Sequence, residues 1–404
     1  MSLLQEHALS DLIVLDLTEY FAGPYCTAFF AGLGANVIKI EPVGRGDGAR
    51  RIGPFFGDDP HPEKSGTFLY LNMGKKSITL DVESLTGKSI FLELLKQADV
   101  LIEDFPPGTM SALGLGYESL ERINPSLVMT SISSYGQTGP YRDYKATEIV
   151  TMATSGHLYS FGDEDREPMM TGGWMSQYHV GTQAFAATMT AILYRDLDGE
   201  GQHVDVSAQE CQASLMEGQF AGYTYTGEFS RRMGPMGRPQ GGTGTFPAKD
   251  GEIDVALPVG SVTEWPRIVR LMGNPALDNH KFMTAENRIE NRDEVDALVR
   301  EWTIRHTRAE AYAKAQEHRL PFAFIRTTSD LLESRQLQER EYFIKVDHPV
   351  AGNIIYPGAP YKMSETPWQA GRAPLLGEHN IEIYCDRLGY RKGDLVYLRG
   401  SGVI

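Results

Sequence analysis

The chain has 404 residues, of which 41% are hydrophobic, and its 38 basic and 53 acidic side chains give a formal net charge of −15. This composition is typical of a globular protein with two or three folding units, and it excludes a disordered or fibrous chain. The acidic balance disfavours a broad nucleic-acid interface, because such a surface repels the phosphate backbone. The 3 cysteines lie far apart, which argues against a disulfide framework or a zinc site and is typical of a reducing compartment.

The first ten residues, MSLLQEHALS, lack the basic segment and apolar core of a secretory signal. No apolar run reaches the length of about 18 residues that a membrane-spanning helix needs. The longest candidate, 184–194, is flanked by Arg195 and Asp196 and is interpreted as a buried helix. We therefore expect a cytoplasmic protein that does not enter a membrane.

Strand and helix patterns alternate over the first 140 residues. Short apolar runs typical of buried strands recur, at 12–17, 37–40, 76–81, 100–103 and 127–131. The segments between them have helical spacing, as in 87–97. Strands separated by helices of about ten residues predict a mostly parallel sheet with both faces covered.

The glycine pair Gly32-x-Gly34 suggests a dinucleotide-binding loop, but it follows the first predicted helix. A pyrophosphate cradle lies instead between a strand and a helix. Only Ala22-Gly23-Pro24 occupies that turn, where Pro24 can take the first helical position because an N–H there would be unpaired. Although Glu41 ends the second strand, where a ribose-binding acid would lie, the placement of the glycines argues against an NAD site.

The pattern changes after residue 140. Helical segments rich in small residues are predicted at 147–158 and 177–194. A glycine- and arginine-rich stretch at 229–244 is too irregular for a packed element and predicts a linker or a functional loop. Three segments follow from this pattern: a large domain at 1–224, a small α+β domain with its linkers at 225–329, and a loop-rich return segment at 330–404 that completes the large domain.

Few isolated motifs in the sequence indicate a catalytic or metal-binding site. His179, His203 and His318 share no metal-ligand spacing, so no metal site is expected. No G-x-S-x-G elbow occurs, which disfavours a serine hydrolase. The acidic run 163–167 is typical of a solvated turn, and a catalytic carboxylate there is the weaker interpretation.

Six stretches, in the same order, together resemble the class III CoA-transferase family, the formyl-CoA and carnitine CoA-transferase group. They are AGPYCTAFFAGLGANVIKIEPVGRGD (22–47), LNMGKKSITLD (71–81), ADVLIEDFPPGTMSALGLGY (98–117), SSYGQTGPY (133–141), GEGQHVDVSAQE (199–210) and APLLGEH (373–379). The resemblance extends from residue 12 to residue 378. One such stretch would be weak support, whereas six in order are specific.

The resemblance implies an α/β protein with a Rossmann-like large domain built from both chain ends, a smaller α+β domain, and an interlinked dimer of ring-shaped subunits. Family members move CoA between carboxylic acids. An aspartate attacks the acyl-CoA thioester, which requires a desolvated carboxylate with amide donors at the developing oxyanion. Coenzyme A thioester is a substrate, and no covalently bound cofactor is implied. The glycine loop over the site would include Gly241, Gly242 and Gly244.

The family aspartate has no counterpart. Counting back from Gly181 places its position at Gln177, and counting back from Tyr194 places it at Tyr178. Neither an amide nor a phenol can serve as the carboxylate nucleophile, and no Asp or Glu occurs between 168 and 194. Glu148 matches the family and is the fallback carboxylate. Racemases of the superfamily use a His-Asp pair where this chain has Thr147-Glu148, so that activity lacks its base.

The positions that the resemblance assigns to CoA are partly degenerate. Family cations are replaced at Glu83, Pro106 and Ala112, and a family amide is replaced by Asp104. Such a pocket has lost three cations and gained two anions, which indicates lost function. The resemblance places the whole set at Phe21, Ala22, Pro42, Leu80, Glu83, Asp104, Phe105, Pro106, Ala112 and Lys145.

We therefore expect a non-catalytic subunit of a hetero-oligomeric CoA-transferase, whose homologous partner carries the aspartate. Succinyl-CoA-dependent activation of an aromatic dicarboxylate, as in anaerobic aromatic degradation, is the example that the family suggests. Two alternatives stay open. One is a self-sufficient homodimeric acyl-CoA enzyme that uses another carboxylate, such as Glu148 or an acid of the turn at 162–167. The other is a non-catalytic binding protein without CoA chemistry.

Overall fold

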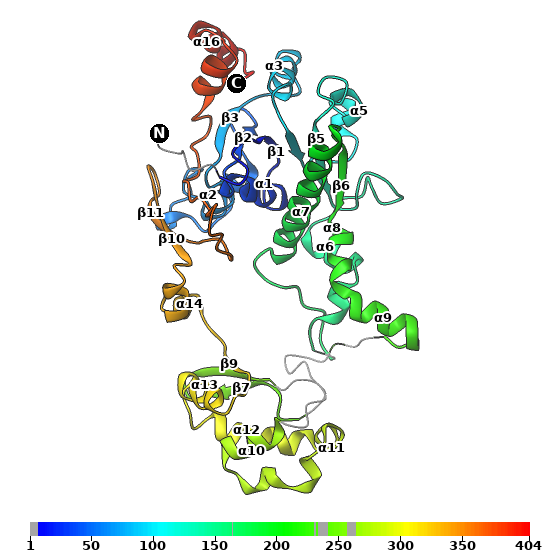
Figure 1. Ribbon diagram of the computed structural model, residues 1–404, viewed down its shortest axis with the longest axis vertical. Helices are drawn as coiled ribbons and strands as arrows, with labels where there is room; N and C mark the ends of the chain where they lie inside the picture. Colours follow the sequence, from blue (N-terminus) through cyan, green and yellow to red (C-terminus); the bar gives the residue numbers. More distant parts are fainter. Residues whose placement is uncertain (1–6, 164, 230–231, 233–240, 257–263) are drawn as a thin grey trace. The chain divides into compact units, whose positions relative to one another are not determined.

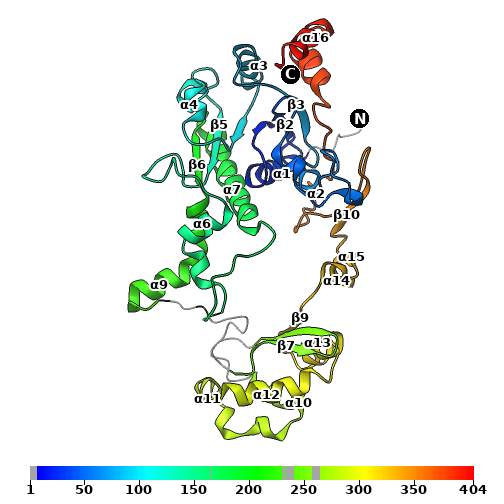
Figure 2. The same ribbon diagram turned by 180° about the vertical axis from the view of Figure 1, so that it is seen from behind.

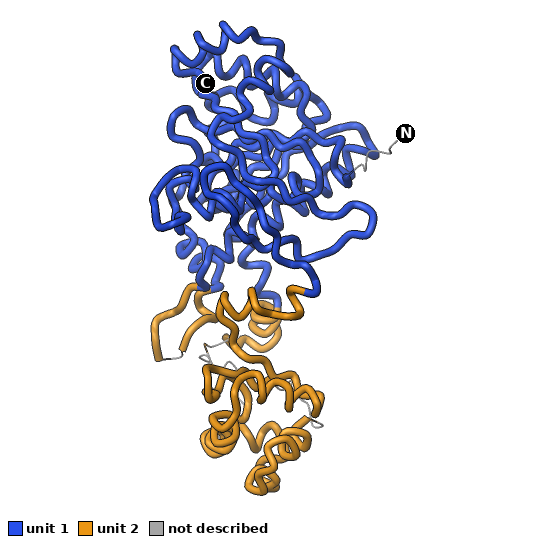
Figure 3. Tube along the Cα trace, turned by 90° about the vertical axis from the view of Figure 1, so that its left-hand side faces the viewer, with its two compact units in different colours: residues 1–157, 171–217, 339–404 blue, residues 158–170, 218–338 orange. Residues whose placement is uncertain are grey.

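The chain forms two compact units in a computed structural model (Figure 3). The structure describes residues 7–163, 165–229, 232, 241–256 and 264–404. Unit 1 contains residues 1–157, 171–217 and 339–404, and unit 2 contains residues 158–170 and 218–338. Both chain ends thus belong to unit 1. The cuts at 217 and 338 replace the expected cuts at 224 and 329, and 158–170 belongs to unit 2 rather than to the large domain.

Unit 1 is built on a six-stranded parallel sheet with the order β3-β2-β1-β4-β5-β6 (Figures 1 and 2). Its strands are β1 (Ile13–Leu17), β2 (Asn36–Glu41), β3 (Lys76–Thr79), β4 (Val100–Glu103), β5 (Val128–Ser133) and β6 (His203–Ser207). Val14 on β1 pairs with Val37 on one side and with Val100 on the other. The predicted parallel sheet is therefore confirmed, and its strand order reverses between β1 and β4.

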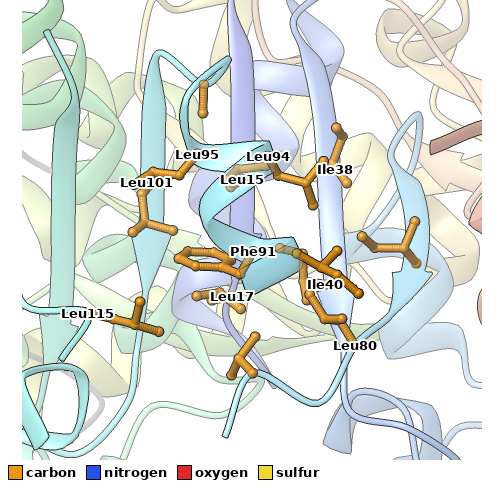
Figure 4. Close-up of a cluster of buried hydrophobic side chains, with 14 of the residues drawn as sticks. Leu15, Leu17, Ile38, Ile40, Leu80, Phe91, Leu94, Leu95, Leu101 and Leu115 are labelled. Atoms are coloured by element: carbon orange, nitrogen blue, oxygen red, sulfur yellow. The ribbon is translucent and has the colours of Figure 1, made fainter. Parts of the chain in front are cut away.

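Apolar side chains are buried on both faces of this sheet, because neighbouring strand residues point in opposite directions. On one face Leu17 and Leu101 pack against Phe91 of α3 (Leu85–Leu95), as Figure 4 shows. On the other face Val14 packs with Phe30 of α1 (Ala22–Gly32) and with residues of α7 (Met175–Asp198). Burial on both faces explains why the strands are continuous apolar runs.

The helices α1 and α7 approach closely because a glycine lies at the contact: a Cβ at Gly181 of α7 would lie 2.5 Å from the carbonyl oxygen of Ala22. A second close contact joins α1 to the segment after β1, where a Cβ at Gly23 would lie 2.3 Å from the Cβ of Thr18. Helical hydrogen bonding begins at Phe21, whose carbonyl accepts from the Tyr25 amide at 2.9 Å. Pro24 is thus the third residue of α1, not the first, but it still lies among the first-turn positions whose N–H has no intrahelical acceptor.

Buried charges are paired where β1 and β2 end. The Lys75 Nζ lies 3.0 Å from an Asp16 oxygen, and the Lys39 Nζ lies 2.8 Å from an oxygen of Asp47. All four side chains are buried. Burial raises the pKa of Asp16, but Lys39 and Lys75 outweigh it and hold that pKa well below its usual range. Burial also lowers the pKa of Lys75, to about 8.

A third buried ion pair involves Glu41, the acid that ends β2. Glu41 accepts hydrogen bonds from the Arg50 guanidinium at 2.7 and 2.8 Å and from the Ser77 hydroxyl at 2.6 Å. The guanidinium also lies over the Phe68 ring, 3.6 Å from its centroid. Glu41 therefore has a structural role, in agreement with the argument against an NAD site.

Unit 2 contains a three-stranded antiparallel sheet with the order β7-β8-β9. Its strands are β7 (Gly244–Ala248), β8 (Gly251–Val255) and β9 (Phe322–Phe324), and its helices include α9 (Glu217–Thr226), α10 (Trp265–Met272), α11 (Ala285–Glu290), α12 (Arg292–Thr303) and α13 (Arg308–Glu317). Phe246, Trp265 and Val299 lie in one buried cluster. The predicted small α+β region is thus present, whereas most of the stretch at 229–244 lies outside the described residues.

From residue 339 onward the return segment belongs to unit 1, and it contains regular elements. It contains the hairpin of β10 (Phe343–His348) and β11 (Gly352–Pro357) and the helix α16 (Lys392–Gly400). It also covers the free side of the edge strand β3. There the Thr79 amide donates to the Asn380 side chain at 3.0 Å, and the Tyr384 hydroxyl donates to the Thr79 carbonyl at 2.7 Å. No described helix has both the length and the hydropathy needed to cross a bilayer.

Adding one methyl group at Gly23, at the start of α1, tests its close contact with Thr18. We expect Gly23→Ala to lower the free energy of unfolding by about 1–3 kcal/mol, because the new Cβ overlaps Thr18. Gly222→Ala on α9 is the matched control, since a Cβ there meets no atom within 4 Å. It should leave stability unchanged or slightly raised. Chemical denaturation measures both, and equal stabilities would contradict the contact.

Candidate active site

A cavity of about 810 Å³ opens in unit 1 beyond the carboxyl ends of β1, β4 and β5. Its walls include the segments 19–22 after β1, 104–107 after β4 and 142–148 after β5, together with the first turn of α7. The strand order reverses between β1 and β4, and doubly wound sheets bind their ligands at such a reversal. The position of the cavity is therefore that of a ligand site.

The cavity brings together residues that the sequence analysis took from separate motifs. Those that line it are Phe21, Ala22, Asp104, Phe105, Pro106, Lys145, Glu148 and Gln177. They come from four segments of the chain, each placed by a different strand or helix. The resemblance to the family thus located most of the lining without any knowledge of the fold.

Other predicted residues do not line this cavity. Leu80 belongs to the buried apolar cluster around α3, and Glu83 and Ala112 are exposed. Pro42 is half-buried, and the Tyr178 ring packs edge-on against Tyr25, with centroids 4.7 Å apart. Of the four positions with altered charge, only Asp104 and Pro106 line the cavity. The assignment of the others to CoA stays a prediction.

The predicted glycine loop belongs to unit 2. The Gly242 amide donates to Asp296 of α12 at 2.6 Å, and the Gly241 amide donates to the Arg288 carbonyl at 3.0 Å. Gly242 has a φ of 80°, and Gly244 begins β7. These glycines are therefore packed within unit 2, and their role as a cover of the site stays a prediction.

Glu148 joins two elements at the edge of the cavity. It is the first residue of α6 (Glu148–Thr154) and is buried. Its Oε1 accepts hydrogen bonds from the Ser176 hydroxyl at 2.5 Å and from the Ser176 amide at 3.2 Å. Ser176 lies in the first turn of α7, where the helix dipole favours a negative charge. The fallback carboxylate is thus already engaged in positioning the turn that carries Gln177.

An aromatic pair forms one wall of the cavity. Trp174 precedes α7 with φ 59° and ψ 27°, a left-handed conformation that is uncommon for a bulky residue. Its ring stacks on that of Phe21, with centroids 4.3 Å apart and an interplanar angle of 20°. The sequence analysis missed Trp174. The only available signal was its place after two glycines, shortly before Gln177.

A second missed residue supplies positive charge. Arg142 lines the cavity together with Lys145. Its Nη2 lies 3.1 Å from where a Cβ of Gly108 would lie, beside the turn in which Pro106 replaces a family cation. Its Nε donates to Asp143 at 3.1 Å. The cavity therefore has two cations on the loop after β5.

Two adjacent carboxyl groups at the end of β4 are shifted towards their neutral forms. Burial raises the pKa of Glu103 to about 7, although its Oε2 accepts from the Phe105 amide at 2.8 Å. Burial also raises the pKa of Asp104 well above its usual range. The Glu19 amide donates to both oxygens of Asp104, at 3.1 and 3.0 Å. The expectation that Asp104 adds a negative charge to the site stays a prediction.

No group of three or more His, Cys, Asp or Glu side chains within the described part of the chain is arranged to hold a metal ion. The cavity is lined by carboxyl, amide, aromatic and cationic side chains. Such a set fits an organic acid or its thioester, with an apolar body and at least one anionic group.

The doubly wound sheet and the position of its cavity define an α/β protein with a small-molecule site. Comparison with known proteins then identifies the family: the chain belongs to CoA-transferase family III, whose family model matches residues 9–380. It shares 33% identity with formyl-CoA:oxalate CoA-transferase of Streptomyces avermitilis, over 98% of this chain and 99% of that protein. It also shares 33% with succinyl-CoA–D-citramalate CoA-transferase of Chloroflexus aurantiacus, over 98% of each.

A solved structure agrees in fold. The crystal structure of a CaiB/BaiF family protein from Brucella suis matches with a TM-score of 0.86 at 30% identity, and covers 95% of this chain and 100% of that one. The resemblance seen in the sequence is thereby confirmed at the level of the family and of its α/β fold. Family III enzymes transfer CoA between carboxylic acids.

The buried carboxyl of Glu103 predicts a pH-dependent stability. Its pKa is about 7 in the folded chain and near 4.5 when exposed, so the folded state binds more protons between these values. Wild-type stability should therefore fall as the pH rises through this window and level off above it. Glu103→Gln removes this contribution, so the melting temperature of the variant minus that of the wild type should increase from pH 5 to pH 8.

Glu118→Gln is the control for that experiment, because it removes an exposed carboxylate from α5 (Tyr117–Leu120) without touching the cavity. Differential scanning calorimetry of the three proteins across the pH range measures the trend. A difference between Glu103→Gln and wild type that stays constant from pH 5 to pH 8 would contradict the raised pKa.

Proposed function

We propose that this chain is the non-catalytic subunit of a hetero-oligomeric family III CoA-transferase, and that a homologous partner subunit carries the nucleophilic aspartate. The observation that supports this most directly is Gln177, a neutral amide that lines the cavity at the position assigned to the nucleophile. An amide does not form the mixed anhydride through which the acyl group would pass. The chain would thus contribute structure and binding rather than the covalent step.

The other candidates near this position are poor substitutes. Glu148 is held by two hydrogen bonds from Ser176. Tyr178 packs against Tyr25 and does not line the cavity. A self-sufficient homodimer that uses another carboxylate, such as Glu148 or an acid of the turn at 162–167, remains the alternative.

The surface of α7 supports assembly with another subunit. Met175, Leu193 and Leu197 are 61%, 62% and 82% exposed on this one helix. Exposed apolar side chains in such numbers are typical of a surface that a partner covers. We propose that a homologous chain covers it in the interlinked arrangement that the family resemblance implies, so that the isolated chain would not be a stable monomer.

The aromatic side chains that line the cavity indicate the class of acceptor acid. The relatives named above act on short carboxylic acids such as oxalate and citramalate. In this chain Phe21, Trp174 and Phe105 line the cavity and offer a flat apolar surface. We propose an acceptor acid that carries an aromatic ring, such as an aromatic dicarboxylate, with succinyl-CoA as the donor.

Co-expression tests whether a partner subunit supplies the catalytic aspartate. We expect the chain alone to form no covalent adduct with succinyl-CoA, because Gln177 offers no carboxylate. Co-expressed with a homologous chain that has the aspartate, it should form a stable hetero-oligomer with CoA-transferase activity. Intact mass spectrometry and a transfer assay measure the two properties. A hydroxylamine-sensitive mass increase on the wild-type chain alone would sink the proposal and point to Asp104 or Glu148.

Introducing an aspartate at residue 177 tests whether this position can carry the nucleophile. We expect Gln177→Asp to give a hydroxylamine-sensitive adduct with succinyl-CoA, since the introduced carboxylate would lie in the cavity wall. Gln177→Asn has the same size without the charge and should give none. If neither variant forms an adduct, the cavity does not present residue 177 to a thioester.

A further inference from the structure

The last residue of β5 carries a hydroxyl group that no described protein group bonds. Earlier on this strand, Thr130 is bonded to Thr188 at 2.7 Å and Ser131 to His203 at 2.9 Å. The hydroxyl oxygen of Ser133 is buried, yet it has no hydrogen-bond partner among the described residues. A buried polar atom without a partner costs free energy, and a binding role accounts for its presence. Because Ser133 lines the cavity, its hydroxyl is available to a ligand there.

Two cations on the loop after β5 also have unused donors. Within the described part of the chain, the Arg142 guanidinium makes one hydrogen bond, from its Nε to Asp143. Its two Nη atoms are therefore free to donate. Lys145 forms neither a hydrogen bond nor an ion pair with any described residue. Both side chains line the same cavity as Ser133.

The other carboxylates of the cavity wall are engaged elsewhere. Glu19 is bonded to Arg45 at 2.6 Å. Glu148 accepts two hydrogen bonds from the first turn of α7. Both oxygens of Asp104 accept from the Glu19 amide. Apart from Asp143, no acid that lines the cavity is thus bonded to the two cations of the loop among the described residues.

We propose that Ser133, Arg142 and Lys145 form a subsite that binds an anionic oxygen group of the ligand. They offer a hydroxyl donor, a guanidinium with two free nitrogen atoms and an ammonium group, and cations form the stronger hydrogen bonds to oxyanions. The proposal rests on the proposed function for its class of ligand. That ligand has two kinds of anionic group, the phosphates of a CoA thioester and the carboxylate of an acid.

The subsite is anchored to the sheet on both sides. The Gln137 amide donates to both oxygens of Asp205 on β6, at 3.1 and 2.9 Å, which fixes the start of the loop. A Cβ at Gly108 would lie 3.1 Å from the Nη2 of Arg142, so the guanidinium lies against the turn after β4. Positive charge is therefore present beside this turn, although Pro106 itself carries none.

Calorimetric titration of the full-length chain with free CoA and with succinate tests the two cations. CoA has phosphates but no carboxylate, and succinate has carboxylates but no phosphate. For the probe that supplies the anionic group, we expect Arg142→Gln and Lys145→Gln each to raise the Kd about tenfold, as loss of a charge-assisted hydrogen bond predicts. Arg142→Lys keeps the charge and should recover part of the affinity.

Arg122→Gln is the matched control for charge. It removes an exposed cation from unit 1 that does not line the cavity. We expect it to leave the Kd of both probes unchanged. Melting curves check that each variant is folded.

Ser133→Ala separates a ligand-binding hydroxyl from a structural one. We expect the Kd of the same probe to rise about fivefold. The melting temperature should stay unchanged or rise, because this hydroxyl has no partner to lose among the described residues. Ser131→Ala on the same strand is the control. It removes a hydroxyl that is bonded to His203, so it should lower the melting temperature and leave the Kd unchanged.

Three results would overturn the proposal: equal affinities in wild type, Arg142→Gln and Ser133→Ala, a loss in Arg122→Gln as large as that in Arg142→Gln, or no binding of either probe to the wild-type chain. A loss confined to CoA identifies the phosphates as the bound group, and one confined to succinate identifies the carboxylate. A loss with both probes shows that either group can occupy the subsite.

These measurements need neither a partner subunit nor a covalent adduct, so they can fail independently of the proposed function. If the subsite fails while the hetero-oligomer transfers CoA, the proposed function is intact. If the subsite binds its anion in a chain that never gains activity with a partner, only the proposed function is refuted.

Discussion

The pairing of buried charges at the ends of β1 and β2 is the constraint on which the site depends. Lys75 bonds to Asp16 and also donates to the carbonyl of Pro24 at 2.9 Å, so one ammonium group joins β1, the start of α1 and the segment before β3. Removing either partner would leave an uncompensated buried charge, which typically costs about 3–5 kcal/mol. The turn that carries Phe21 into the cavity wall is fixed by this network.

Two carboxyl groups at the same edge of the sheet, Asp16 and Asp104, have different surroundings. Asp16 is ionised and structural because two lysines face it, whereas Asp104 faces a peptide amide and the cavity. A counter-ion within a few ångströms thus distinguishes Asp16, which holds the scaffold together, from Asp104 in the cavity wall. Residue type alone does not distinguish them.

The elements that could be predicted are those in which one local signal dominates. The strands around Val14 and Val37 are apolar runs buried on both faces, and the helices between them follow from spacing. The β10–β11 hairpin was missed because Lys345 and Asp347 interrupt its apolar pattern. In the site, the resemblance located Gln177, but the approach of Arg142 to Gly108 and the stacking of Trp174 on Phe21 depend on distances that no linear pattern contains.

The return of the C-terminal segment to β3 has a consequence for biosynthesis. The edge strand obtains hydrogen-bond partners from Asn380, 301 positions downstream of Thr79, and from Tyr384, 305 positions downstream. Contacts of such separation form late, because the loop must close before they stabilise anything. During translation the sheet therefore stays open along β3 until nearly the entire polypeptide has been synthesised. In that interval the edge of β3 is open to pairing with other strands.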